Sequence, residues 1–125
     1  MPRRARPVRF EHGYGQRLPY PDASFDRVLS AFMLHHLEGE TRGQTLAEVR
    51  RVPRPGGALY LVDFGGDVVG PEGVLARRLG HSARLRHNLG DGVLADLREA
   101  GFTESTELAQ RVGRLGPVTY YRAAI

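Results

Sequence analysis

The sequence contains no cysteine, no lysine and no long hydrophobic run. The absence of cysteine excludes disulfide scaffolds, thiolate metal sites and cysteine nucleophiles. The longest strongly apolar run, Val28–Leu34, is far too short to cross a bilayer. The basic start, MPRRARP, leads into polar residues instead of the apolar core of a signal peptide. These absences predict a soluble protein of the cytoplasm with no membrane segment.

All eighteen basic residues are arginine, and the net charge of +4 corresponds to a pI of about 10.1. Arginine binds phosphate as a planar fork, which makes nucleic-acid binding an alternative to consider. The arginines are scattered from Arg3 to Arg122, however, and no aromatic RNA-binding motif accompanies them. Uniform use of arginine reflects genomic base composition more often than a binding patch. Nucleic-acid binding is therefore only a minor alternative.

The 125 residues have the composition of one globular domain, with 41% hydrophobic and 26% charged residues. The alternation of Val8 and Phe10 with charged neighbours predicts a short strand. The nearly continuous apolar run Phe25–Leu34 predicts a parallel strand that is covered on both faces. A second buried strand is predicted over Ala58–Phe64. Two strands joined by a glycine-rich segment are expected to end the chain, at Thr103–Leu108 and Val118–Ala124.

Three helices are predicted between these strands. The first is Thr41–Val52, which Pro55-Gly56-Gly57 follows as a helix-to-strand turn. Its apolar residues recur at intervals of three on one face, namely Leu46, Val49 and Val52. The second covers Pro71–Leu89, and the third begins after the N-cap Asp91 and stops at Gly101. Alternating strands and helices with a final strand pair indicate an α/β fold with an antiparallel edge.

Four segments carry a family resemblance that none of them carries alone. A Pro-Gly-Gly turn or a PDASFD turn occurs in many α/β proteins, but here the segments occur together in a fixed order. They are LPYPDASFD, FMLHHL, RVPRPGGALYLVDF and LREAGF, starting at Leu18, Phe32, Arg51 and Leu97. Their combination resembles the class I S-adenosylmethionine-dependent methyltransferases. The similarity is greatest to the small-molecule branch that includes the ubiquinone and menaquinone biosynthesis methyltransferases.

The resemblance implies a Rossmann-like sheet and S-adenosylmethionine as the cofactor. It places Tyr14 and Gly15 in the turn that reads the adenine, with Tyr14 where the family usually has an acidic or amide residue. It places Ala31 and Phe32 at the cofactor-facing end of the fourth strand. Pro53 replaces the family's leucine and is expected to end the preceding helix near Val52.

No stretch of the sequence matches the family's glycine-rich loop or its ribose-binding carboxylate. The resemblance therefore implies that residues 1–125 form a partial domain, from the third strand to the C-terminus, without the first two strands. A fragment of a working methyltransferase is the favoured interpretation. The alternatives are a non-catalytic interaction module and one half of a two-chain enzyme. Without its neighbours the fourth strand is expected to expose an apolar edge that invites a protein partner or self-association.

Methyl transfer from a sulfonium needs alignment above all, with a base only where the nucleophile must lose a proton. No paired acid and base stands out in the sequence. By analogy with the family, His35 and His36 are the candidate bases; contact with substrate or a packing role are the alternatives. A metal site at these histidines is disfavoured, because no cluster of Asp, Glu or Cys lies near them in the sequence.

The segment Gly65–Gly90 corresponds to the part of the family domain that covers the acceptor pocket. Arg78 and His81 are the candidate acceptor contacts in this segment. The acceptor is expected to be a small, partly apolar molecule such as a quinone or a phenol. The alternative is an amphipathic helix that covers the sheet with its arginines in water.

Overall fold

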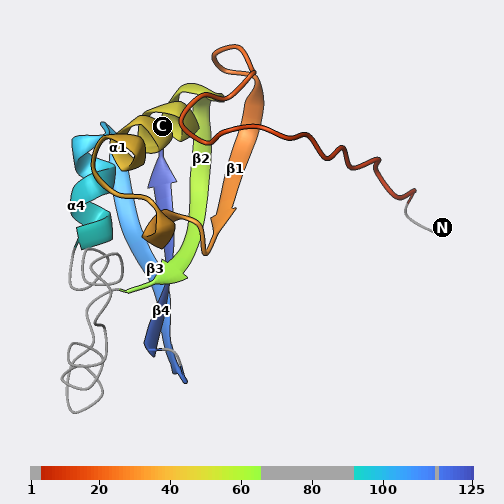
Figure 1. Cartoon of the computed structure of the whole chain (residues 1–125). Coiled ribbons are helices and arrows are strands. Elements are labelled where there is room, and N and C mark those ends of the chain that lie inside the picture. Colours follow the sequence, from red (N-terminus) through yellow and green to blue (C-terminus); the bar gives the residue numbers. More distant parts are fainter. Residues whose placement is uncertain (1–3, 66–91, 115) are drawn as a thin grey trace.

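A four-stranded mixed sheet forms the centre of the structure, a computed structural model that describes residues 4–65, 92–114 and 116–125 (Figure 1). The strand order is β1-β2-β4-β3. β1 and β2 are parallel, whereas β4 is antiparallel to both β2 and β3. The strands are β1 Phe25–Ala31, β2 Pro53–Phe64, β3 Glu104–Gly113 and β4 Gly116–Ala124. The predicted α/β class with a C-terminal antiparallel pair is confirmed.

The described helices are the short 3-10 turn η1, Leu34–His36, and the α-helices α1, Gly39–Arg51, and α4, Gly92–Glu99. α1 turns the predicted apolar face inward, since Leu46 and Val49 are buried. Val52 caps the helix and Pro53 opens β2, so the helix ends where the proline was expected to end it. This short connection places α1 between the parallel strands β1 and β2 as their crossover.

The Pro-Gly-Gly segment lies inside β2 instead of forming a turn before it. Phe25 of β1 pairs with Pro53 of β2, but Arg27 pairs with Ala58, so the register shifts and β2 bulges between these pairs. Gly57 lies in the bulge, where a Cβ atom would meet the carbonyl oxygen of Asp26 at 2.6 Å. Only glycine allows this approach of the two backbones.

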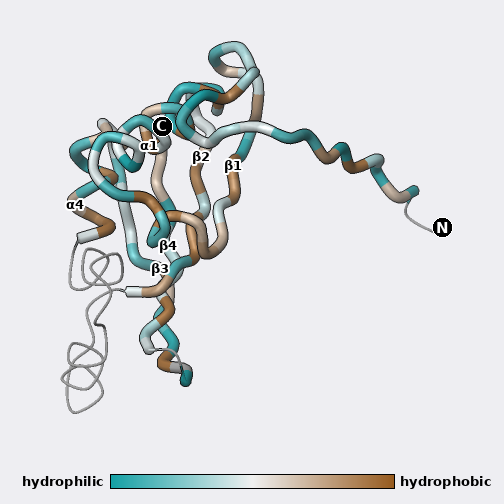
Figure 2. Tube along the Cα trace, viewed as in Figure 1, coloured by the Kyte–Doolittle hydropathy of each residue, from teal (hydrophilic) through white to brown (hydrophobic). Residues whose placement is uncertain are grey.

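One face of the sheet carries the hydrophobic core. Alternate residues of β2 and β4 are buried on this face, where α1 and α4 pack against them. The buried core residues are Leu34, Leu46, Val49, Leu59, Leu61, Val93, Leu97, Phe102, Tyr121 and Ala123. Figure 2 shows the hydrophobic stretches of β1 and β2 beside each other in the sheet.

Two strand predictions were wrong. Val8 and Phe10 lie in an extended tail with 74% and 94% exposure and no regular structure (Figure 1), because a strand forms only beside a partner strand. The run from Phe25 forms a strand only as far as Ala31. β1 is an edge strand with Leu29 78% exposed, so it is not covered on both faces.

The end of α4 follows the prediction. Gly101 has a φ of +96°. Its N–H donates to the carbonyl of Arg98, and the N–H of Phe102 donates to the carbonyl of Leu97. This is a Schellman ending of a helix. The predicted helix Pro71–Leu89 and the N-cap Asp91 lie outside the described residues. None of the described helices has the length and apolar character needed to cross a membrane.

Candidate functional site

The carboxyl ends of β1 and β2 lie side by side because the two strands are parallel neighbours. Ligands of open α/β sheets bind at this end of the strands. β1 ends at Ala31, and Phe32 adopts a left-handed backbone conformation with φ +54°. Its N–H still bonds to the carbonyl of Val62 at 2.9 Å. This strained residue turns the chain into η1, which lies next to the end of β2 (Figure 1).

A histidine and an aspartate meet at the carboxyl ends of β1 and β2. Nδ1 of His35 lies 2.7 Å from Oδ1 of Asp63, the penultimate residue of β2. The backbone N–H of His35 donates to Oδ2 at 3.3 Å, and the N–H of Phe64 donates to Oδ1 at 2.8 Å. The Asp63 side chain is fully buried, whereas 12% of the His35 side chain is exposed. The carboxylate therefore has three hydrogen bonds, which replace those that water would make to it at the surface.

This pair could not be read from the sequence. Asp63 lies 28 residues after His35 in the chain and yet bonds to it directly. The two side chains therefore form a pair that their separation in the sequence conceals. The structure brings Asp63 to His35; His36 is exposed and stacks on His35, with 3.9 Å between the ring centroids.

Two phenylalanine rings lie on one side of the pair. Phe64 lies edge-on to His35 with 5.1 Å between ring centroids, and Phe32 lies 5.0 Å from Phe64. Phe32 is 42% exposed, so it presents part of its ring at the surface. The site thus combines a fixed imidazole with an aromatic wall.

The other candidate cofactor residues lie in the turn before β1. Tyr14 pairs with Arg17 in an isolated bridge, and the N–H of Arg17 donates to the carbonyl of Tyr14. A Cβ atom on Gly15 would meet Thr45 of α1 at 3.1 Å and the sulfur of Met33 at 3.9 Å. Gly15 therefore lies near the start of η1, whereas Tyr14 is 65% exposed and its ring packs against that of His12.

Arg51 fixes the loop between this turn and β1 to helix α1. Its guanidinium donates to the carbonyls of Leu18 and Tyr20 and to the side chains of Asp22 and Glu48. Glu48 also accepts the N–H of Leu18 at 2.8 Å. Hydrogen bonds from Arg51, followed by the bond from Leu18, lower the pKa of Glu48. The LPYPDAS segment is thereby held against the helix.

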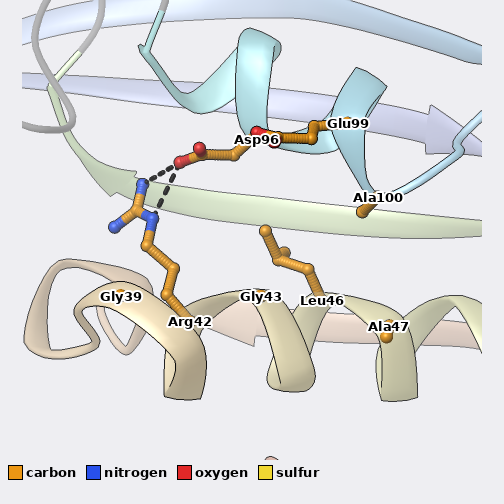
Figure 3. Close-up of a pocket in the computed structure, with 8 residues that line it drawn as sticks. All are labelled: Gly39, Arg42, Gly43, Leu46, Ala47, Asp96, Glu99 and Ala100. Carbon is orange, nitrogen blue, oxygen red and sulfur yellow. Dashed lines mark hydrogen bonds and ion pairs between the residues drawn. The ribbon is translucent and has the colours of Figure 1, made fainter.

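A pocket of about 480 Å³ lies between α1 and α4 (Figure 3). Arg42 and Asp96 form an ion pair across it, and both the Nε and the Nη2 of Arg42 lie 2.7 Å from the carboxylate. Nη1 of Arg42 donates to the carbonyl of Leu34, the residue before His35. The remaining lining residues are Gly39, Gly43, Leu46, Ala47, Glu99 and Ala100. This ion pair joins the two helices and supports the turn that carries His35.

Comparison with known proteins confirms the resemblance to methyltransferases. Residues 2–61 match the family described as methyltransferase domain. The chain is 39% identical to a demethylmenaquinone methyltransferase of Deinococcus radiodurans, over 93% of this chain and 50% of the relative. It is 37% identical to the 27-O-demethylrifamycin SV methyltransferase of Amycolatopsis mediterranei, over 94% of this chain and 43% of the relative. The chain thus spans about half the length of these relatives.

The fold agrees with this relationship. A SAM-dependent methyltransferase of Thermotoga maritima, described as a possible histamine N-methyltransferase, superposes with a TM-score of 0.66 at 18% identity. The match covers 89% of this chain and 61% of that protein. The chain is therefore similar to class I S-adenosylmethionine-dependent methyltransferases in sequence, and its sheet has their Rossmann-like fold.

Asp63 is the site residue that the sequence analysis missed. Asp63 lies near the end of an apolar run that is predicted to form a second parallel strand. The carboxyl ends of neighbouring parallel strands lie close together, so this position was a usable signal for a side chain that faces His35. Arg78 and His81 lie outside the described residues. Within residues 4–65, 92–114 and 116–125, no group of three or more His, Asp or Glu side chains is arranged to hold a metal ion.

Proposed function

We propose that the chain, at least within an intact form of the domain, carries out S-adenosylmethionine-dependent methyl transfer to a small-molecule acceptor. The observation that carries this proposal is the His35–Asp63 pair at the carboxyl ends of β1 and β2, in a relative of the methyltransferases. The names of the two relatives support a small acceptor, since demethylmenaquinone and a demethylrifamycin are both small molecules.

The residues proposed to hold the cofactor are Tyr14, Gly15, Ala31 and Phe32. The exposed rings of Tyr14 and Phe32 suit an adenine or a sulfonium, because aromatic faces stack on bases and attract cations. The described residues thus fit part of the cofactor. S-Adenosylmethionine supplies a methyl group on a positively charged sulfur; the chain's own residues align the acceptor and exclude water.

The test is transfer of a labelled methyl group from S-adenosylmethionine at millimolar concentration. The acceptor panel contains phenols, quinols, a nucleic acid and a protein. We expect label on a small molecule. Label on nucleic acid or protein alone, or on no acceptor at all, contradicts the proposal.

Arg78 and His81 are proposed to contact the acceptor. Changing each residue to alanine is expected to raise the acceptor KM or lower turnover. If both quantities stay unchanged, these side chains are only solvated surface. Action in the cytoplasm stays a prediction from the sequence.

A second candidate function is association through β1. This strand pairs only with β2 among the described strands, and Leu29 is 78% exposed on it. An unpaired edge of this kind accepts a strand from another chain. A second copy, or a partner that completes a two-chain enzyme, would use this edge.

Light scattering during gel filtration tests the association. We expect Leu29→Lys to reduce the mass of the associated species, because lysine on an edge strand opposes pairing. Leu108→Lys on the opposite edge strand β3, where Leu108 is 54% exposed, is the matched control. A monomeric wild-type chain, or equal effects of both changes, contradicts association through β1.

A further inference from the structure

The face of the sheet opposite the core, called the outer face below, has no helix on it among the described residues. Leu34 of η1, Leu46 of α1 and Val93 of α4 all pack into the core, so the described helices lie on one side of the sheet (Figure 1). Strand pairing sets the side chains of the outer face in rows across β1, β2 and β4. One row is Leu29, Tyr60 and Arg122, and the next is Ala31, Val62 and Tyr120.

The outer face is apolar and accessible over three neighbouring strands. Leu29 on β1 is 78% exposed, Tyr120 on β4 is 40% exposed, and Val62 on β2 between these strands is partly exposed. Contiguous apolar surface that spans several elements marks an interaction site more often than scattered apolar residues do. The outer face therefore has the character of a surface that another element covers.

Two arginines flank Tyr60 on the outer face. The guanidinium carbons of Arg27 and Arg122 each lie 5.9 Å from the centroid of the Tyr60 ring. Nε of Arg122 also donates to the Tyr60 hydroxyl at 3.3 Å. Neither arginine forms an ion pair with a residue that the structure describes. Tyr60 thus holds two unneutralised charges in place, which reduces the entropy that anionic groups lose when they bind there.

The backbone of the sheet decides which kind of element can cover this face. β2 and β4 have a neighbouring strand on both sides, so their backbone groups are already paired and an extended peptide gains no hydrogen bonds on top of them. A helix satisfies its own backbone and needs only an apolar stripe, as α1 and α4 do on the core side. Four strands about 4.8 Å apart span about 14 Å, which accommodates a helix about 10 Å wide.

We propose that the outer face docks an amphipathic helix of a partner protein, with acidic residues on both flanks of its apolar stripe. The apolar stripe covers Leu29, Val62 and Tyr120. The flanking carboxylates pair with Arg27 and Arg122. Complementary charge of this kind speeds the encounter and selects among partners that have the same apolar stripe.

Two other occupants fit the outer face less well. A second copy that docked face to face would bring the same two arginines together, in a chain whose net charge is already +4. A single-stranded nucleic acid would pair its phosphates with the arginines but would place sugar and phosphate against Leu29 and Val62. The outer face also differs from the edge of β1, since Tyr120 and Arg122 lie on β4, two strands away from that edge.

Fluorescence anisotropy of the complete chain with labelled helical peptides tests the proposal. The probe peptide has about five helical turns, with leucines along one face and glutamates on both flanks of that face. The matched peptide has the same leucines, with lysines in place of the glutamates. We expect the glutamate peptide to bind, and the lysine peptide to bind more weakly by about tenfold or more. Equal binding of the two peptides, binding of neither, or tighter binding of a single-stranded DNA overturns the proposal.

Variants of the two arginines test the charge pairing. Arg27→Ala/Arg122→Ala is expected to weaken binding of the glutamate peptide by about tenfold or more. Arg27→Ala alone, at an exposed side chain, should cause part of this loss without disturbing the fold. Arg98→Ala, at an exposed arginine of α4, removes the same charge and is the matched control. An equal loss in the control, or no loss in either arginine variant, overturns the proposal.

Methyl NMR locates the bound peptide. We expect the glutamate peptide to shift the methyl resonances of Leu29 and Val62. The methyl resonances of Leu46 and Leu97, on the core side of the sheet, should stay unchanged. Shifts confined to Leu29 indicate pairing along the edge of β1 and overturn docking on the outer face. Shifts confined to Leu46 and Leu97 overturn it as well.

Discussion

At the scale of single residues, two buried polar groups differ in how they are satisfied. The carboxylate of Asp63 has three hydrogen bonds, whereas the hydroxyl of Tyr121 has no partner among the described residues. Tyr121 is 2% exposed, and burial raises its pKa to about 12. A buried hydroxyl without a partner costs stability, which is acceptable at a packing position because the ring itself fills the core.

Removing this hydroxyl gives a prediction about alkaline stability. In the unfolded chain, Tyr121 ionises near pH 10, whereas in the folded chain it stays neutral until about pH 12. Its contribution to stability is full below pH 10 and is lost as the pH rises toward 12. We expect Tyr121→Phe to be as stable as the wild type at neutral pH, or up to about 1 kcal/mol more stable.

The measurement is urea unfolding at neutral pH and at about pH 11. The variant should lose less stability over this interval than the wild type does. Tyr120→Phe, on the exposed face of the same strand, is the matched control. An identical loss in the wild type and in Tyr121→Phe would show that the buried hydroxyl does not titrate in this way.

At the scale of elements, two glycines associated with helices differ in their backbone conformation and in the space available for a Cβ atom. Gly101 ends α4 with a positive φ, and a Cβ there would lie 3.1 Å from Nε of Arg50. Gly43 lies inside α1, where a Cβ would meet nothing within 4 Å. The same substitution is therefore predicted to act in opposite directions at the two positions.

We expect Gly101→Ala to lower the free energy of unfolding by about 1–2 kcal/mol, because alanine is strained in the left-handed region. Gly43→Ala should raise it by about 0.5–1 kcal/mol through the better helix propensity of alanine. Urea unfolding of both variants measures the two effects. Stabilisation by Gly101→Ala would contradict the helix ending described above.

The contact between α1 and α4 depends on the Arg42–Asp96 ion pair, whose side chains are 4% and 16% exposed. Removing Asp96 takes this ion pair away from the buried guanidinium of Arg42. We expect Asp96→Leu to lower the free energy of unfolding by about 3–5 kcal/mol. The double variant Arg42→Met/Asp96→Leu should recover part of this loss, because the buried guanidinium is removed together with the carboxylate that it pairs with.

Thermal and urea unfolding of the two variants compare the single and double changes. If the double variant is less stable than Asp96→Leu, the ion pair is not the dominant contact. The bond from Arg42 to the Leu34 carbonyl would then account for the loss.

At the scale of the whole molecule, the described sheet presents one edge of the proposed methyltransferase site. The carboxyl ends of β1 and β2 supply the imidazole, its carboxylate and the aromatic rings. The sequence has no match to a glycine-rich loop or a ribose carboxylate. We therefore expect few polar contacts to the sugar and the amino-acid end of the cofactor.

We consequently expect the 125-residue chain to bind S-adenosylmethionine weakly. Each missing polar contact removes about 1 kcal/mol, and several together weaken affinity by orders of magnitude. Calorimetry on the purified chain measures the dissociation constant. Binding in the low-micromolar range would contradict the prediction.

The candidate site was predicted only in part from the sequence. His35 and His36 were proposed through the resemblance, and the structure places both beyond the end of β1. Asp63 could not be paired with His35 from their separation of 28 residues. The parallel pairing of β1 and β2 creates that contact, because it aligns two carboxyl ends that a whole helix separates in the chain.

The sequence by itself determined the α/β class, the buried face of α1, the core of β2 and the stop of α4 at Gly101. These features follow from local causes, namely the periodic placement of apolar side chains and the backbone angles that proline and glycine impose. Only the tertiary structure decided that Val8 and Phe10 form no strand. It also decided that Asp63 orients His35. Each of these depends on which segment lies alongside another, since strand hydrogen bonds and burial require a neighbour that local sequence does not specify.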